Sequence, residues 1–474
     1  MAGTTGTPER RGRALLVASA GYFFVLLDVT IVNVALAAIG GGLGASRSEL
    51  QWVVDAYALV LAAFMLGAGD LADRLGARRL FVAGLALFGL GSLGCAAAPA
   101  AAFLVGARVV QGLGAAAILP TSLAIVNQLF PDEGERPRAI GVWAALGGTA
   151  LVAGPIVGGL LVDPFGWRAI FWLNLPLVLA ALGGALAMLP APAGGDARRA
   201  RQDVAGQVLG TIALLAAVFA LIEGGRDGFL SPAALAGAAV ALAALLGFLA
   251  AEHRAERPLL EPRWFRRPEF AGANAGAALM NLGTLGGLFA ISLYLQQSRG
   301  LSPLQNGLAL VPLAFPLAAL TPFTGRLVAA VGPRWPAGLG LLASGLGYAG
   351  LAVGGGGIAD DPAGWALLAL AGTGMALAVP GLVAGATEAL GPDRAGIASA
   401  INNTSRQIGG AIGVALIGGF GGFSTSLAAS AAALLLGGLL AMSLMGGSLD
   451  PRTSLPLLRG RGSNDPPITS KATN

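Results

Sequence analysis

Three ionisable side chains lie inside stretches of the sequence that are apolar enough to cross a membrane. Asp28 belongs to the run LDVTIVN at 27–33, Asp55 follows the start of the second apolar run, and Arg108 the start of the fourth. At about 1.5 Å of rise per helical residue, Asp28 would lie roughly 20 Å above the inner edge of the membrane. Asp55 and Arg108 would lie roughly 8–9 Å below the outer edge, so we expect all three in one layer.

Two acids and a base at one depth are suited to proton chemistry. Burial and a neighbouring cation shift the pKa of a carboxyl group in opposite directions, so alternating exposure can load and unload a proton. We interpret Asp28 as a proton carrier, the alternative being a structural carboxylate. Asp55 is either a substrate or proton site or a charge in an outer vestibule. Arg108 cannot deprotonate and either tunes the carboxylates or anchors a helix by an ion pair.

The composition indicates a polytopic membrane protein. Of the 474 residues 55% are hydrophobic and only 11% are charged, against about 25% charged in soluble domains. The net charge of +5 does not indicate nucleic-acid binding, because the arginines sit at helix ends. Cys95 is the only cysteine, so no intramolecular disulfide can form. No nucleotide-binding loop, metal-ligand cluster or nucleophile motif is present, so we expect no enzyme activity and no cofactor other than the proton as coupling ion.

Apolar runs between charged or turn-rich breaks predict fourteen transmembrane helices. Positive charges orient them: 23 of the 29 Lys and Arg fall on the side of the N-terminus, four on the other side and two within spans. This asymmetry places both termini in the cytoplasm. The predicted spans are 15–38, 50–69, 80–98, 102–125, 138–161, 168–190, 204–223, 232–252, 270–295, 304–323, 335–354, 363–386, 396–418 and 427–447.

The sequence repeats itself. Gly112 and Gly114 with Pro120 recur as Gly372 and Gly374 with Pro380, at an offset of 260; Gly69 and Gly76 recur as Gly325 and Gly332, at an offset of 256. Two six-helix halves follow, which is the architecture of the major facilitator fold. The predicted organisation is a cytoplasmic segment 1–14, an N-terminal half 15–190, a linker 191–203, two inserted helices 204–252, a linker 253–269, a C-terminal half 270–447 and a disordered cytoplasmic tail 448–474.

Three further groups of residues are candidates for moving parts. The segment 69–79 is expected to form a cytoplasmic loop that latches in one conformation, through Gly69, Asp73, Arg74, Gly76 and Arg78. Proline kinks a helix and glycine permits close contact, so an outer hinge and seal is predicted at Gly154, Pro155, Gly158 and Gly159. Polar residues inside spans are candidates for lining a cavity; these are Asn33, Gln111, Asn281, Asn402 and Arg406. For Arg406 an extension to the cytoplasmic end is the alternative.

These motifs resemble those of the major facilitator superfamily. The loop 69–79, the run Arg108–Gly112 and the pattern around Pro155 are similar to its signatures, and the run 27–36 is similar to the first-helix motif of its fourteen-helix drug–proton antiporters of the EmrB/QacA type. Ala37 and Ala150 depart from these patterns, which affects only local hinge geometry. The resemblance implies efflux of amphipathic, often cationic, drugs driven by inward proton flow.

We therefore expect a monomeric drug:proton antiporter in a bacterial cytoplasmic membrane, working by alternating access on a small amphipathic substrate. Abundant arginine and alanine with a single lysine, Lys471, are typical of a GC-rich bacterial genome. A dedicated exporter of one secreted metabolite or antibiotic is the alternative that the motifs leave open. A membrane sensor that does not transport is less compatible with the sequence, because no folded output domain is present.

Overall fold

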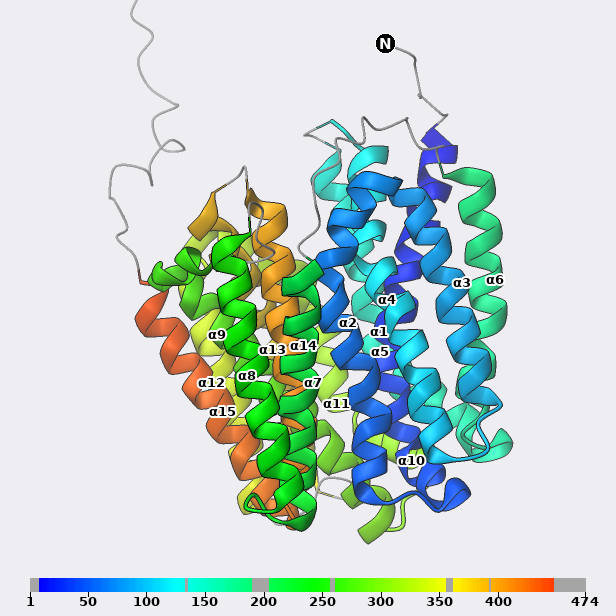
Figure 1. Ribbon diagram of the computed structural model, residues 1–474, viewed down its shortest axis with the longest axis vertical. Coiled ribbons are helices and arrows are strands. Elements are labelled where there is room, and N and C mark those ends of the chain that lie inside the picture. The colour runs from blue at the N-terminus through cyan, green and yellow to red at the C-terminus, as the bar shows by residue number, and fades with distance from the viewer. Residues whose placement is uncertain are drawn as a thin grey trace, which may run out of the picture.

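The chain folds into two bundles of long helices that lie side by side (Figure 1). The computed structural model describes residues 8–132, 135–189, 204–255, 261–354, 361–391 and 394–446. The predicted connector 191–203 and tail 448–474 lie outside the described residues, as do parts of the other predicted segments. Every regular element of the described part is helical, as expected for a chain whose backbone groups must be satisfied within the membrane.

The N-terminal bundle consists of six helices. They are α1 (Pro8–Leu43), α2 (Arg47–Leu75), α3 (Ala77–Ala96), α4 (Ala101–Leu129), α5 (Arg136–Phe165) and α6 (Ala169–Met188). The C-terminal bundle consists of α9 (Pro268–Leu293), α10 (Pro303–Ala309), α11 (Val311–Val331), α12 (Arg334–Val353), α13 (Pro362–Leu390), α14 (Ala395–Gly419) and α15 (Phe423–Leu444). Helix α9 is extended by a π-helical turn at Tyr294–Ser298, and the 3-10 helix Pro262–Arg266 precedes it. Between the bundles come α7 (Val204–Asp227) and α8 (Pro232–Arg254).

Eleven described helices are long and apolar enough to cross a membrane, or twelve if the bent pair α10 and α11 forms one span. The pair bends by 48°. Helices α5 and α14 occupy the fifth and thirteenth predicted spans but are not among the eleven. Helix α14 carries the polar run 402–407, and the apolar stretch found in α5 is limited to Ala153–Phe165.

The internal repeat is visible in backbone contacts. A Cβ built on Gly112 would lie 2.8 Å from the carbonyl oxygen of Tyr57 in α2, and one on Gly372 would lie 2.0 Å from that of Leu313 in α11. The residues of each pair are separated by the offsets of 260 and 256. Gly114 against Gly84 and Gly374 against Gly340 repeat the match between α4–α3 and α13–α12. Small residues thus bring equivalent helices into backbone contact in both bundles.

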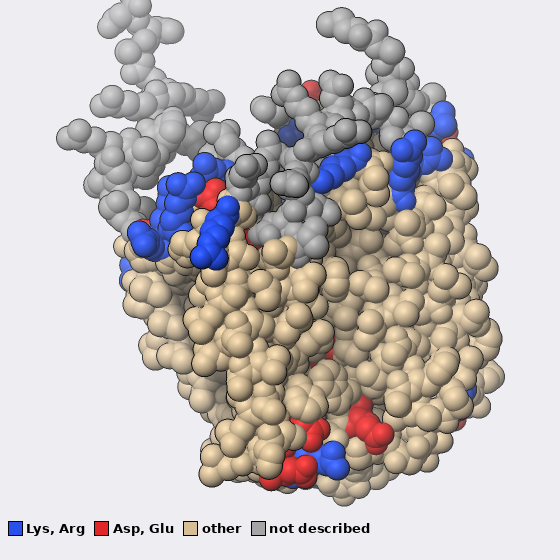
Figure 2. Space-filling model, in the orientation of Figure 1, with Lys and Arg blue, Asp and Glu red and all other residues tan. Residues whose placement is uncertain are grey.

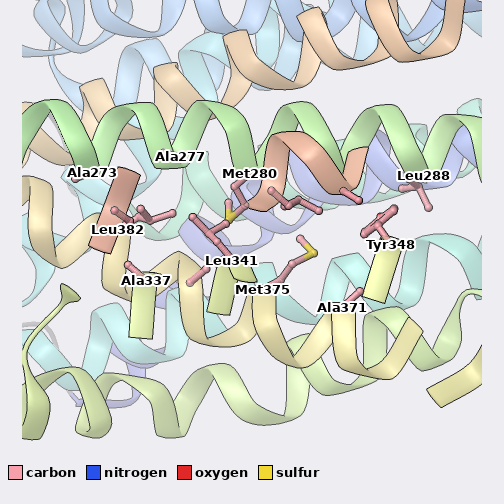
Figure 3. Packing of buried hydrophobic residues seen from close by; sticks show 14 of the residues in the cluster. Ala273, Ala277, Met280, Leu288, Ala337, Leu341, Tyr348, Ala371, Met375 and Leu382 are labelled. Carbon is pink, nitrogen blue, oxygen red and sulfur yellow. The ribbon is translucent and has the colours of Figure 1, made fainter. Parts of the chain in front are cut away.

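Each bundle has its own apolar core. In the C-terminal bundle, buried side chains of α9, α12 and α13 interdigitate, with Met280, Leu341 and Met375 at the centre (Figure 3). The N-terminal bundle is built around Phe81 and Phe88 of α3. Helix α8 packs on α7, and α7 packs on both α2 and α14. The inserted pair therefore covers the line where the two bundles meet.

The two ends of the molecule differ in charge. Arginines gather at the end where the chain begins, while the middle of the face in view is almost free of charge (Figure 2). We call this end the arginine-rich end and define it by Arg11, Arg78, Arg136, Arg267 and Arg334. The two bundles diverge toward it and approach each other at the opposite end (Figure 1).

Backbone contact between α3 and α4 predicts a matched pair of substitutions in one helix. A methyl group added by Gly114→Ala would lie 2.4 Å from the backbone nitrogen of Phe88, whereas one added by Gly106→Ala meets no atom within 4 Å. Overpacking typically costs about 1–3 kcal/mol. We expect Gly114→Ala to lower the thermal unfolding temperature of the purified protein in detergent and Gly106→Ala to leave it unchanged. Equal unfolding temperatures for the two variants would contradict the close contact.

Candidate functional site: a buried charge network

An ion pair lies at the centre of the N-terminal bundle. The Arg108 guanidinium on α4 contacts the Asp28 carboxylate on α1, and the two side chains are 1% and 0% exposed. Arg108 Nε also donates to the carbonyl oxygen of Val53 at 3.0 Å, and its guanidinium lies 4.2 Å from the centre of the Tyr57 ring. The sequence places Asp28 and Arg108 at one depth, and the structure brings them into contact.

A shell of uncharged polar side chains completes the network. Gln111 Nε2 donates to Asp28 Oδ1 at 2.8 Å and to Ser92 Oγ at 2.9 Å, while Gln111 Oε1 accepts from Arg108 at 2.7 Å. Asn174 Nδ2 of α6 reaches Asp28 Oδ1 and Ser92 Oγ, both at 3.3 Å. Buried charges are stable only when their remaining hydrogen-bonding groups are satisfied, and here α1, α2, α3, α4 and α6 supply the partners.

Asp55 lies beside this network but outside it. Its side chain is fully buried, and neither carboxylate oxygen has a hydrogen-bond partner. Asp55, Arg108 and Asn33 line one small cavity, which is closed on the side of the C-terminal bundle by Leu285, Gly410 and Val414. Its volume of about 10 Å³ is roughly the room that one water molecule needs. Asn33 therefore lines a cavity as predicted, whereas Gln111 belongs to the ion-pair network.

The two bundles touch closely at the end opposite the arginines. A Cβ on Gly159 would lie 2.4 Å from Leu304 Cα of α10, and one on Gly307 would lie 2.1 Å from the carbonyl oxygen of Pro155. Gly154 and Gly158 instead face α1 at Thr30, Ile31 and Val34. The predicted contact with the other half is thus present at Pro155 and Gly159, but the other two glycines pack within their own half.

Hydrogen bonds between the bundles accompany this contact. Gln51 Nε2 donates to the carbonyl oxygens of Val414 and Ala415 at 3.1 and 3.0 Å. Ser302 Oγ donates to Asp163 Oδ2 at 2.8 Å, and Arg47 to the carbonyl oxygen of Phe420 at 2.9 Å. In this structure the end opposite the arginines is therefore closed.

At the arginine-rich end, the predicted loop is shorter than expected. Helix α2 continues through Gly69 to Leu75, because nothing in 69–75 breaks it, and Arg74 lies in its last turn. Gly76 makes the turn with a φ of 88°, a conformation that favours glycine. Arg78 donates to the carbonyl oxygens of Ala185 and Leu186 and so ties α3 to α6 within one half. The side chain of Asp73 lies outside the described part of the structure.

The polar candidates of the C-terminal bundle separate into two groups. Asn402 is fully buried and donates to the carbonyl oxygen of Ala273, so it joins α14 to α9 and does not line a cavity between the halves, as the sequence had suggested. Asn281 is half-buried on α9, close to Gly410 of α14. Arg406 is half-buried and donates to Asn403 Oδ1 at 2.6 Å. It sits in the middle of α14 and not at its end.

A larger and mostly apolar cavity lies where the inserted helices meet the two bundles. Its volume is about 390 Å³, which is within the usual range for small-molecule sites. Helices α2, α7, α8 and α14 form its walls, and no charged side chain lines it. The lining residues are Ala62, Ala63, Gly206, Gln207, Gly210, Thr211, Ala213, Leu214, Ala217, Ala241, Leu242, Leu245, Phe248, Thr404 and Ile408.

Sequence reasoning missed Asn174, Ser92 and the partners of Gly159 on α10. Asn174 had a usable signal, because it is a lone amide in the apolar helix α6. Within the described ranges, no group of three or more His, Cys, Asp or Glu residues is arranged to hold a metal ion.

Comparison with known proteins identifies the family. The model of the Major Facilitator Superfamily matches residues 18–414 and, in a second match, 272–471. The chain belongs to the major facilitator superfamily. It is thus a multi-pass membrane transporter rather than an enzyme. A solved superfamily structure, a peptide transporter POT in complex with sulfate, has a TM-score of 0.69 at 16% identity and covers 93% of this chain and 95% of its own. That likeness concerns the fold alone.

Several superfamily members are more similar in sequence. The Methylenomycin A resistance protein of Streptomyces coelicolor is 37% identical over 449 residues, which are 92% of each chain. The Multidrug resistance protein Stp of Mycobacterium tuberculosis is 38% identical over 408 residues, 85% of this chain and 74% of its own. The Tetracenomycin C resistance and export protein of Streptomyces glaucescens is 34% identical over 429 residues, 88% and 78%.

The ion pair in this superfamily member predicts strong coupling between its partners. Asp28→Asn leaves a buried arginine unpaired and Arg108→Leu a buried carboxylate, and breaking a buried pair from one side costs about 3–5 kcal/mol. The double variant removes both charges, so we expect it to lose much less stability than the two single variants summed. Unfolding free energies in detergent give the cycle. Additivity within about 0.5 kcal/mol would show that the two side chains do not stabilise each other.

Proposed function

We propose that the protein exports amphipathic drugs or other toxic small molecules across the bacterial cytoplasmic membrane in exchange for protons. The observation that carries this proposal is the buried contact between Asp28 and Arg108, with Asp55 unpaired beside it. An ionisable residue within a membrane span is by default a candidate functional site. The names of the relatives, which refer to antibiotic resistance, multidrug resistance and export, support the direction of transport.

The proposed proton step follows from the charge of the network. With Asp28 ionised, the pair with Arg108 is neutral and the bundle can close around it. A proton on Asp28 would leave Arg108 as a buried cation, which is costly in a membrane interior. Arg108 then needs another anion or water, and Asp55 lines the same small cavity. Arg108 would therefore move toward Asp55 when Asp28 takes up a proton, and return when Asp28 releases it.

The proposed topology has fourteen spans, with both termini in the cytoplasm. The gathering of arginines at one end supports this orientation through the preference of positive residues for the cytoplasmic side. The closed end, with Gly159 against Leu304, would then face outward. Alternating access would open this end and close the arginine-rich end. We further propose a monomer that needs no cofactor beyond the coupling proton.

A dedicated exporter of one antibiotic is a second candidate, because two of the relatives are named for a single compound. A panel of compounds tests breadth in a host that lacks its own efflux pumps. Growth protection against methylenomycin A or tetracenomycin C alone supports the dedicated exporter. Protection against several unrelated amphipathic compounds supports the multidrug function.

Proton coupling predicts a specific loss for Asp28→Asn. In proteoliposomes with an imposed pH gradient, we expect substrate movement by the native chain to follow the gradient. Asp28→Asn should lower the gradient-driven rate at least tenfold, because the side chain can no longer exchange a proton. Asp227→Asn changes an exposed carboxylate after α7 and should leave the rate unchanged. Gradient-driven transport that survives Asp28→Asn would remove the proposed proton carrier.

Alternating access predicts that fixing the closed end stops transport. Asp163 and Ser302 lie on different bundles and share a hydrogen bond of 2.8 Å. In a Cys95→Ser background, Asp163→Cys with Ser302→Cys should cross-link under mild oxidation and lose transport, and a reductant should restore it. Each single cysteine variant is the control and should transport under both conditions. Full transport by cross-linked protein would contradict a cycle that opens this end.

A further inference from the structure

Arg406 is a cation within a membrane span that lacks an acidic partner. It sits near the middle of α14, and no described ion pair includes it. One guanidinium nitrogen, Nη2, donates to Asn403 Oδ1 at 2.6 Å, while the buried Nε has no hydrogen-bond partner. Arg108, by contrast, is neutralised by Asp28.

The sequence of the surrounding helices offers no substitute acid. Helices α11 and α14 contain no Asp or Glu, and α5 contains none before Asp163 at its far end. In α1 the only acid beyond Glu9 in the first turn is Asp28, which is held by Arg108. An uncompensated guanidinium inside a span is costly and is a candidate binding site for an anion.

An aromatic pair from the other bundle lies opposite this arginine. Arg406 is within electrostatic range of Tyr22 on α1. The Tyr22 ring stacks on the Trp143 ring of α5, with 4.0 Å between ring centres and 12° between planes. Trp143 Nε1 donates to Ser122 Oγ at 3.1 Å, and a Cβ on Gly147 would lie 2.0 Å from the Tyr22 ring. The aromatic pair is therefore held in place by α4 and α5.

We propose that Arg406 and Asn403, facing the Tyr22–Trp143 pair, bind the carboxylate or other anionic group of an amphipathic aromatic substrate. The guanidinium supplies charge-assisted hydrogen bonds to the anion, and the two rings offer an apolar surface to the rest of the molecule. This inference rests on the proposed export function and specifies its substrate class: organic acids and zwitterions. A ligand in this position touches both bundles, so their relative movement would alter its affinity.

The test compares ligands that differ only in charge. Purified protein in lipid nanodiscs is titrated with naphthylacetate and pyrenebutyrate and with their uncharged primary amides. We expect the native chain to bind at least one carboxylate tenfold or more tightly than its amide. Arg406→Gln should abolish this preference by weakening carboxylate binding alone, and Arg406→Lys should retain part of it. Arg226→Gln, which changes an arginine at the end of α7, is the control and should retain all of it.

The outcomes separate this proposal from the export function. Equal affinity of the native chain for carboxylate and amide, absence of carboxylate binding, or an equal loss for both ligands in Arg406→Gln would overturn it. If Arg406→Gln does not fold, the native comparison and Arg406→Lys decide. A charge preference that depends on Arg406 together with transport that ignores the proton gradient would support the anion site and remove the proton-coupled function.

Discussion

Burial of one ion pair is the constraint on which the N-terminal bundle depends. Asp28 and Arg108 are removed from water almost completely, and removing two charges from water costs several kcal/mol for each ion unless the remaining groups are satisfied. Five helices must therefore converge on one point. Glycines make this convergence possible: a Cβ on Gly91 would lie 2.5 Å from the Gln111 nitrogen, and one on Gly112 would lie 2.8 Å from the Tyr57 carbonyl oxygen.

The C-terminal bundle keeps the packing of the repeat but not its charges. At the repeat offsets, Arg108 corresponds to Leu368, Gln111 to Ala371 and Ser92 to Tyr348, and all three counterparts are buried in the apolar core. Val311 stands where Asp55 would be. The glycine contacts that set the helix spacing recur, so the same backbone arrangement forms without an ion pair. Proton chemistry of the proposed kind can thus take place only in the N-terminal half, and the other half supplies a partner against which it moves.

The sequence predicted positions along the membrane normal better than directions around each helix. Asp28 and Arg108 could be paired because depth follows from residue counts, but the same counts placed Asp55 beside them without revealing that its carboxylate has no partner. Gln111 and Asn402 were interpreted as cavity residues because a polar side chain in a span must face inward, and inward includes contacts within one bundle. The contact of Gly159 with Leu304 joins segments of different halves, and no local pattern encodes that distance. Gly69 was assigned to a loop because glycine frequently ends helices, yet α2 continues through it.

Helix α5 connects the proposed proton site to the closed end of the molecule. One face of its turn at 154–159 packs Gly154 and Gly158 against α1 at Thr30–Val34, only a few residues beyond Asp28. The other face packs Pro155 and Gly159 against α10 of the opposite bundle. Neither contact leaves room for a side chain between the helices, so α5 cannot follow a shift of α1 without disturbing its contact with α10. Because packed contacts of this kind are bistable rather than continuously deformable, a change in charge at Asp28 that moves α1 would favour release of the closed end. The glycines of this turn therefore do more than permit close packing: they place one rigid helix between the carboxylate and the contact that keeps the halves together.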